Sequence, residues 1–315
     1  LLSNKFKYNS MYKYIYLPFE IKSRDLIGRV VLASYLAERD CKVIVFYKGH
    51  TEQVLKYYPK GIYFHHGIVR NYLNVIQKVK RLGHKVFAWD EEGFVFPSDD
   101  EHVNNRMDIK VYKELEKYFL WGEHQEKLLM RKMNDVSKTT KVGHPRLDLL
   151  RQEFRAYLSI DAEKIKEKYG KFILLNTKFN SNHFLGKQQA VNRLKKGDYF
   201  RGDNKFEQFH VDKMEYNNKN FDYYASLIPK LSKKFMDYNI IIRPHPSENF
   251  NTWERIYKNH NLNNIHVVHE GSVLQWLIAA DIMIHNGCTT GVESFALGKP
   301  SILYKPVIDT RFDIY

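Results

Sequence analysis

The chain has 315 residues, of which 43 % are apolar and 15 % aromatic, so it is long enough for two domains with substantial cores. No apolar run reaches the ~20 residues that a membrane-spanning helix needs. The only two cysteines, Cys41 and Cys288, are too few for a disulfide framework, which indicates a reducing, cytoplasmic location.

The net charge is strongly positive, because 50 Lys and Arg outnumber 36 Asp and Glu to give +14. The basic residues are scattered, and no zinc-finger spacing, RNA-binding aromatic block or basic repeat accompanies them. Nucleic-acid binding is therefore not expected. An enzyme with polyanionic donors, in peripheral contact with the anionic inner face of a membrane, would account for the charge. The N-terminus lacks the apolar region of a signal peptide, and Met11 is expected to start the native chain after a leader of ten residues.

The first half alternates short apolar strands with longer helices. Helices are expected at Leu26–Arg39 and Val69–Leu82. The expected strands are Tyr14–Phe19, Lys42–Tyr47, Gly61–His65, Lys85–Trp89 and Tyr118–Trp121. Such an alternation predicts βαβ units and a parallel sheet.

The pattern restarts after a turn at residues 142–145. The expected strands are Phe172–Asn176, Asn239–Arg243, Ile265–His269, Ile282–His285 and Ser301–Tyr304. The expected helices are Ala162–Tyr169, Tyr223–Phe235, Val273–Ala279 and Thr290–Leu297. Between them, residues 180–218 are polar and poorly periodic, which predicts a mobile surface insertion.

The restart predicts an α/β protein of two Rossmann-like domains, each with a parallel sheet. The N-terminal domain, residues 1–140, is expected to take the acceptor, and residues 141–315 are expected to bind a nucleotide-sugar. In such folds ligands bind outside the carboxyl ends of the strands. The two sheets are therefore expected to face a central cleft.

The most informative segment follows the strand Ile282–His285, where a small-residue turn leads into a helix. Thr289 and Thr290 offer hydroxyls at the start of that helix, beside backbone N–H groups at its positive dipole end. Gly287 and Gly291 let the backbone approach a ligand closely. This combination predicts a phosphate site and a nucleotide-linked substrate. The threonines can also be ordinary N-caps, which is compatible with phosphate binding.

A second strand end of the same half carries Arg243 and then His245, in a turn fixed by Pro244 and Pro246. His245 is predicted to donate a hydrogen bond to a phosphate or base, with Arg243 supporting the charge. The alternative is a histidine that merely ends the strand. Glu293, one turn into its helix, is predicted to accept hydrogen bonds from ribose hydroxyls. The alternative there is an ordinary first-turn glutamate.

Three carboxylates, Asp90, Glu91 and Glu92, end the strand Lys85–Trp89 in the first half. Their mutual repulsion is expected to raise the pKa of at least one of them, which suits a general base. The alternative is a solvated acidic turn.

The first strand ends with Glu20, Lys22 and Arg24, whose side chains are predicted to hold an acceptor or a phosphate. A charged surface loop is the alternative. No metal site or cofactor is expected, because the histidines lack metal-ligand spacing. His65 and His66 are adjacent, so their rings are expected to point apart on a strand.

The chain resembles the bacterial surface carbohydrate biosynthesis proteins, a family of glycosyltransferases with the GT-B fold. The resemblance covers most of the chain. It is carried by residues 17–22, Asp90-Glu-Glu-Gly, Gly143-His-Pro-Arg-Leu-Asp148, Arg243-Pro-His-Pro and the segment from Thr289 to Pro300. More remotely, the chain is similar to bacterial sialyltransferases and Kdo transferases. Those enzymes use CMP-sugars and have an acidic motif with the base, a His-Pro motif on CMP and a Ser/Thr pair on the donor phosphate.

Carried over by residue, the resemblance places Glu92 at the base position, His245-Pro246 in the His-Pro motif and Thr289-Thr290 in the hydroxyl pair. Glu92 stands where the acidic motif usually has Asp, so Glu91 or Asp90 can be the working carboxylate instead. The turn at residues 243–246 also resembles that of CDP-glycerol polyol-phosphate transferases.

The resemblance implies a metal-independent glycosyltransferase that moves a Kdo- or sialic-acid-like sugar from a CMP donor to a surface polysaccharide or glycolipid. The enzyme alternatives are a UDP-sugar 2-epimerase and a CDP-polyol phosphotransferase. The alternative outside enzymes is a carbohydrate- or nucleic-acid-binding protein. GT-B enzymes usually continue with one or two further helices, so truncation after Tyr315 is expected.

Overall fold

The computed structural model describes residues 13–92, 95–96, 98–179, 189, 192, 195–196, 204–246, 248–258 and 262–313. The expected leader lies outside the described residues. So do Gly93 of the acidic turn and nearly all of residues 180–203 in the expected insertion.

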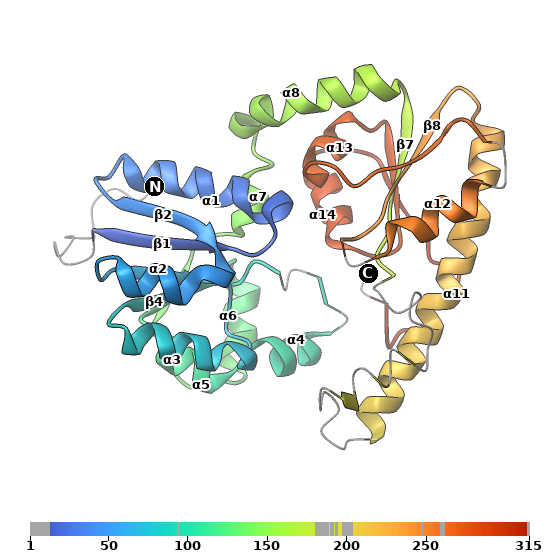
Figure 1. Cartoon of the computed structure of the whole chain (residues 1–315). Coiled ribbons are helices and arrows are strands. Elements are labelled where there is room, and N and C mark those ends of the chain that lie inside the picture. The colour runs from blue at the N-terminus through green and yellow to red at the C-terminus, as the bar shows by residue number, and fades with distance from the viewer. Residues whose placement is uncertain are drawn as a thin grey trace. The chain divides into compact units, whose positions relative to one another are not determined.

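The chain forms two compact units, Leu1–Arg151 and Gln152–Tyr315, each built on its own parallel sheet (Figure 1). The division falls after Arg151, whereas the sequence placed it after residue 140. Strand β6 (Thr139–Lys141) explains this, because it pairs with β5 (Lys117–Leu120) of the first sheet. The short helix α7 (Pro145–Asp148) follows it within the first unit.

Among the residues that the structure describes, the first sheet has six parallel strands in the order β2-β1-β3-β4-β5-β6. The other four strands are β1 (Tyr14–Phe19), β2 (Lys42–Tyr47), β3 (Ile62–His65) and β4 (Lys85–Trp89). The chain goes from β1 to β2 on one side and then returns across β1 to β3. The strand order therefore reverses between β1 and β3, which is where open α/β sheets bind ligands.

Helices cover both faces of this sheet. They are α1 (Lys22–Ala37), α2 (Thr51–Tyr57), α3 (Leu73–Arg81), α4 (Asp99–Arg106), α5 (Ile109–Glu114) and α6 (Glu123–Met130), with 3₁₀ turns η2 (Lys48–His50) and η3 (Arg70–Tyr72). Ile15 and Leu17 of β1 pack towards α1, whereas Tyr16 packs towards α2 and α3. This burial on both faces explains the continuous apolar runs of the strands.

The sequence predicted the long helices and missed α2, α4, α5 and α6, which have only six to eight residues each. Helices this short show too few turns for a clear periodicity. Local caps mark two of them. Ser98 accepts a hydrogen bond from the backbone of Glu101 at the start of α4, and Asp108 accepts two from the first turn of α5.

Over its described residues the second sheet has five parallel strands in the order β11-β10-β7-β8-β9. They are β7 (Phe172–Asn176), β8 (Asn239–Arg243), β9 (Ile265–Val267), β10 (Ile282–His285) and β11 (Ser301–Leu303). The strand order reverses between β7 and β10. The accompanying helices are α8 (Gln152–Tyr169), α11 (Asn204–Lys234), α12 (Phe250–Lys258), α13 (Val273–Ala279) and α14 (Thr289–Ala296).

The prediction of an irregular insertion over residues 180–218 was wrong for its last part, because α11 already begins at Asn204. One face of α11 is buried at every fourth residue, through Tyr216, Asn220, Tyr224, Ile228 and Ser232. Two of these residues are polar, so the apolar periodicity was hidden. No helix in the described part of the chain combines the length and the hydropathy that crossing a membrane requires.

Candidate functional site

Asp90 and Glu91 follow β4 as buried carboxylates, with side chains only 1 % and 9 % exposed. Each forms an ion pair with an arginine from a helix. Nη2 of Arg106 lies 2.7 Å from Oδ1 of Asp90, and Nη2 of Arg29 lies 2.6 Å from Oε1 of Glu91. These two carboxylates are therefore buried and paired, which contradicts a solvated acidic turn at Asp90 and Glu91.

Burial affects the pKa of these two carboxyl groups differently. Burial alone would raise the pKa of Asp90, but the charge and hydrogen bonds of Arg106 outweigh it and hold the pKa below its usual range. Burial raises the pKa of Glu91, and Arg29 opposes that effect only in part. The expected raised pKa is thus present at Glu91, with burial and not repulsion as its main cause.

Glu92 is the accessible member of the acidic group, with 33 % of its side chain exposed. Its Oε1 lies 2.6 Å from Nη1 of Arg24. Its backbone N–H donates to Oδ1 of Asp90 at 3.1 Å, so the buried aspartate fixes the backbone of the half-buried glutamate. Of the three carboxylates, Glu92 is the one that a substrate can reach most easily.

The predicted acceptor group joins this cluster in part. Glu20 forms an ion pair with Lys48, and its Oε2 lies 3.7 Å from Nη2 of Arg24. Glu20 and Arg24 therefore extend the charged network from Glu92 to the end of β1. Lys22 is the exposed first residue of α1, and its side chain makes no ion pair with any other described residue.

His65 is the last residue of β3 and His66 follows it, and both are buried. The expectation that their rings point apart was wrong, because the ring centroids are 5.0 Å apart. The strand ends at His65, and Gly67 with φ of 121° turns the chain immediately afterwards. Burial, reinforced by Arg29, lowers the pKa of His66 to about 4, so its ring is neutral near pH 7.

In the second unit, hydrogen bonds join the segments that follow β7 and β10, the two strands between which the strand order reverses. The backbone N–H of Lys178, after β7, donates to Oδ1 of Asn286 at 2.9 Å, and Nδ2 of Asn286 donates back to the carbonyl of Lys178 at 3.2 Å. Burial, with the charge of Lys213 adding to it, lowers the pKa of Lys178. An anion bound beside this lysine would oppose that effect.

Helix α14 begins at Thr289, three residues after Asn286. Its N-cap is Cys288, and no side chain caps the first N–H groups. The alternative that the threonines are N-caps was therefore wrong. The hydroxyl of Thr290 contacts the sulfur of Cys288, and Thr289 and Thr290 are half-buried. Backbone N–H groups without a capping side chain, at the positive end of a helix, are a typical anion site.

Gly291 has a packing role in the first turn of α14. A Cβ atom at this position would lie 2.5 Å from Cε1 of His285. The ring of His285 is fixed by the N–H of Gly287, which donates to Nδ1 at 3.2 Å. Burial lowers the pKa of His285 to about 4, so a neutral ring supports the helix end.

Arg243 stabilises a neighbouring loop. Its two terminal nitrogens each donate to a backbone carbonyl, of Glu270 and of Gly271, at 2.6 Å. Burial lowers the pKa of Arg243 to about 10. His245 and Pro246, after β8, are exposed, so a ligand can reach them.

Glu248 organises the loops after β7 and β8, and the sequence did not single it out. Its buried carboxylate accepts hydrogen bonds from the hydroxyl of Thr177, the backbone of Phe179 and the indole of Trp253, all at 3.0 Å. The backbone N–H of His245 also donates to it, at 3.3 Å. Burial raises the pKa of Glu248, and these hydrogen bonds oppose the effect.

The remaining predicted residue, Glu293, is 4 % exposed within α14. Its contact with a ribose stays a prediction. Among the described residues, no three His, Cys, Asp or Glu side chains lie close enough together to hold a metal ion.

Sequence reasoning missed Lys178, Asn286, Arg29 and Arg106, although three of them carried a signal. Lys178 and Asn286 are polar residues directly after or near the end of a buried strand, the same signal that identified the acidic group. Arg29 is a charged residue among the apolar positions of α1. Arg106 comes from a helix that was not predicted.

No protein-family model matches this sequence, and no curated protein matches it. Solved structures do match in fold. The UDP-N-acetylglucosamine 2-epimerase from Rickettsia bellii has a TM-score of 0.54 at 13 % identity, covering 92 % of this chain and 78 % of that chain. The UDP-GlcNAc 2-epimerase from Methanocaldococcus jannaschii, in complex with UDP-GlcNAc and UDP, has a TM-score of 0.52 at 14 % identity, covering 92 % and 83 %.

The wall teichoic acid polymerase TagF, soaked with CDPG, has a TM-score of 0.50 at 12 % identity, covering 92 % of this chain and 69 % of that chain. Identities this low show a likeness of fold alone. They confirm the predicted fold of two Rossmann-like domains with parallel sheets. None of these three proteins is a CMP-sugar transferase, so that part of the resemblance gains no support.

Proposed function

We propose that this protein is a glycosyltransferase that takes a nucleotide-linked sugar and transfers it to an acceptor hydroxyl. The observation that carries the proposal is the second reversal point. There Lys178 and the uncapped N-terminus of α14 are held together through Asn286. A cation and a helix end in one place bind a diphosphate by charge and by backbone hydrogen bonds.

The same groups give the second unit its part in the reaction. When the bond between sugar and nucleotide breaks, negative charge builds up on the leaving phosphate. Lys178 and the N–H groups of α14 stabilise that charge, and fixed donors of this kind usually make the largest contribution to catalysis. His245, on the exposed turn after β8, is placed as a further donor to the nucleotide.

The first unit supplies the proton chemistry. Glu92 takes the proton from the acceptor hydroxyl, because it is the accessible carboxylate of its group. Arg24 and the buried Asp90 hold it in position. Glu91 and Asp90 act as fixed charges whose partners are Arg29 and Arg106.

The donor nucleotide is better supported as a nucleoside diphosphate than as CMP. The similar structures include proteins in complex with UDP and UDP-GlcNAc, or soaked with CDPG. The same similarity favours a second candidate function, epimerisation of a UDP-sugar at C2. That reaction leaves the nucleotide attached and needs no acceptor.

The two candidates separate in one assay with donor and water alone. The purified protein is incubated with UDP-GlcNAc, CDP-glycerol or CMP-sialic acid, and the products are followed by NMR. A transferase releases free nucleotide slowly, because water replaces the acceptor. An epimerase gives the C2 epimer with the nucleotide still attached, and that product would contradict glycosyl transfer.

A further inference from the structure

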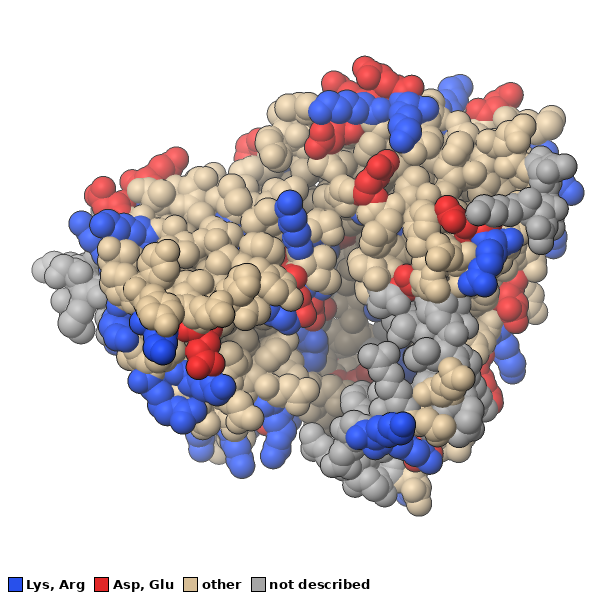
Figure 2. All heavy atoms as spheres, viewed as in Figure 1, with Lys and Arg blue, Asp and Glu red and all other residues tan. Residues whose placement is uncertain are grey.

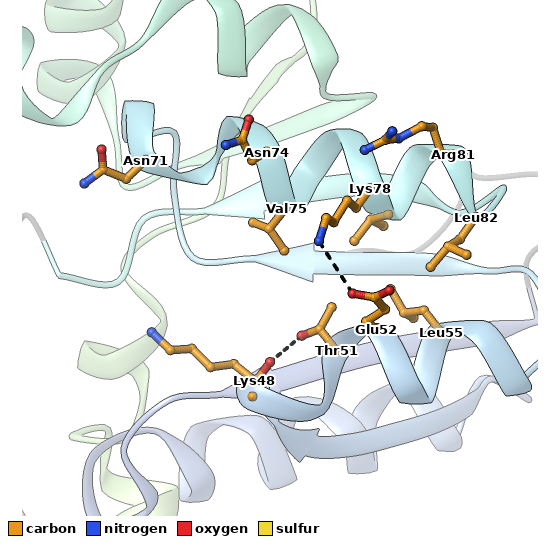
Figure 3. Close-up of a pocket in the computed structure, with 12 residues that line it drawn as sticks. Lys48, Thr51, Glu52, Leu55, Asn71, Asn74, Val75, Lys78, Arg81 and Leu82 are labelled. Carbon is orange, nitrogen blue, oxygen red and sulfur yellow. Dashed lines mark hydrogen bonds and ion pairs between the residues drawn. The ribbon is translucent and has the colours of Figure 1, made fainter.

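A groove of about 690 Å³ runs between α2 and α3 of the first unit (Figure 3). This volume is within the range of ligand pockets, roughly 300–1,000 Å³. None of the site residues considered so far lines it except Lys48. Its lining includes Lys48, Thr51, Glu52, Leu55, Asn71 and Asn74, and then Val75, Lys78, Val79, Arg81 and Leu82.

The groove is explained by the polar residues on the side of α3 that faces α2. Its lining residues recur three or four positions apart, so they form one stripe along the helix. Neighbouring helices on a sheet usually bury apolar side chains against each other. Here the stripe carries the exposed Asn74, Lys78 and Arg81 at the rim, above a buried floor of Leu55 and Val79.

The charge of the groove is positive. Three cations line it, against the single carboxylate of Glu52. Nζ of Lys78 lies 3.6 Å from Oε2 of Glu52 across the groove (Figure 3), but this pair is exposed and a ligand can displace it at little cost. Arg81 makes no ion pair with any other residue that the structure describes. Figure 2 shows Lys and Arg side chains gathered on the surface of the first unit.

One end of the groove meets the network around Glu92. Lys48 lines the groove and forms an ion pair with Glu20. Glu20 in turn contacts Arg24, the partner of Glu92. A chain lying in the groove would therefore reach the charged edge of the first sheet.

We propose that this groove binds an acidic oligosaccharide, as the extended part of the acceptor. The inference rests on the proposed function only in treating the bound chain as an acceptor. The asparagine amides exchange hydrogen bonds with sugar hydroxyls, and Lys78 and Arg81 pair with carboxylate or phosphate groups. The half-buried Val75 and Leu82 contact the apolar faces of the rings. The lining residues include no aromatic side chain on which a nucleobase could stack, which disfavours nucleic acid.

The test measures binding of a fluorescent galacturonate oligosaccharide by polarisation, with no donor present. The test variant is Lys78→Gln/Arg81→Gln. The matched control is Lys56→Gln/Lys60→Gln, which removes the same charge from exposed lysines of the first unit outside the groove. We expect the test variant to bind about tenfold more weakly and the control to bind as the unchanged protein does. A neutral maltooligosaccharide of the same length should bind more weakly than the acidic one.

Three results would overturn the proposal: no binding to the unchanged protein, an equal loss in both variants, or equally tight binding of single-stranded DNA with the same loss. The circular-dichroism melting curves of both variants should match that of the unchanged protein, because all four side chains are exposed. Calorimetric titration with UDP separates this proposal from the function. If the unchanged protein does not bind UDP, the proposed glycosyltransferase function is contradicted. The binding of the oligosaccharide to the groove would still hold.

Discussion

The carboxyl ends of the two sheets differ in how many full charges they carry and in how these charges are paired. The first is crowded with full charges, and each member of its acidic group pairs with a different arginine. The second is close to neutral in its interior. It has a buried glutamate that only accepts hydrogen bonds, a lysine with a lowered pKa and a helix end without a capping side chain.

This difference fits the division of labour between the units that we propose. Ion pairing with Arg24 fixes the position of Glu92 before any substrate arrives, which suits proton transfer. A lysine and backbone N–H groups in a largely neutral surrounding attract an anion, which suits the leaving phosphate. The predictions below test the division from the largest effect to the smallest.

Glu92→Gln should separate chemistry from nucleotide binding. The amide keeps the size of the side chain but cannot take a proton, so donor turnover should fall by about 10²- to 10⁴-fold. Nucleotide affinity should stay unchanged in calorimetry, because the nucleotide is assigned to the second unit. Glu38→Gln, at an exposed glutamate after α1, is the control and should keep full turnover. Equal turnover in the two variants would remove Glu92 from the chemistry.

Arg29→Met should show how much the first cluster depends on pairing. It leaves the buried Glu91 without its ion-pair partner, which should lower the free energy of unfolding by about 3–5 kcal/mol. Adding Glu91→Gln should restore most of that loss. In the second unit, Arg311→Met removes the ion pairs with Asp212 and Asp309, whose arginine is 53 % exposed, and should lower stability far less than Arg29→Met does. Urea titrations followed by tryptophan fluorescence measure both.

Acid should destabilise both units through their neutral histidines. The pKa of His66 is about 4 in the folded protein, below its ordinary 6.5. Between these values the unfolded chain binds a proton that the folded chain does not, so stability is lost as the pH falls from 6.5 to 4. Each such histidine contributes about 1.4 kcal/mol per pH unit. His66→Gln should reduce the slope by that amount, and an unchanged slope would contradict a neutral buried ring.

Gly291→Ala tests the packing at the start of α14 by adding one methyl group. The new Cβ would press on His285, which should cost about 1–3 kcal/mol. Gly28→Ala, within α1, is the contrasting variant in the first unit. Its new Cβ would lie 3.7 Å from Cδ1 of Leu149, which is an ordinary van der Waals contact. That change should stabilise by about 0.5–1 kcal/mol through helix propensity. Thermal melts that rank the two variants the other way would contradict the packing at α14.

The sequence predicted much of the fold because most strands are short and largely apolar, and because long helices follow several of them. Strands such as Tyr14–Phe19 and Phe172–Asn176 have the predicted bounds. The start of α11 was missed because the buried face of the part that precedes the predicted helix at Tyr223–Phe235 includes the polar Asn220.

Candidate site residues could be singled out from the sequence where polar side chains come after a strand, as with Asp90 after β4 and Thr289 after β10. The arginines that pair with the acidic group were not singled out, because these ion pairs form only when α1 and α4 fold against the end of β4. Glu248 was not singled out from the sequence either, because its four hydrogen-bond donors are brought together only by folding.

The most direct test of nucleotide binding by the second unit is a calorimetric titration with UDP, CDP and CMP at one salt concentration. We expect UDP or CDP to bind more tightly than CMP, and Lys178→Gln to weaken that binding about tenfold or more. Lys171→Gln, at an exposed lysine just before β7, should leave it unchanged. Absence of binding, or an equal effect of the two variants, would contradict a phosphate site at Lys178 and α14.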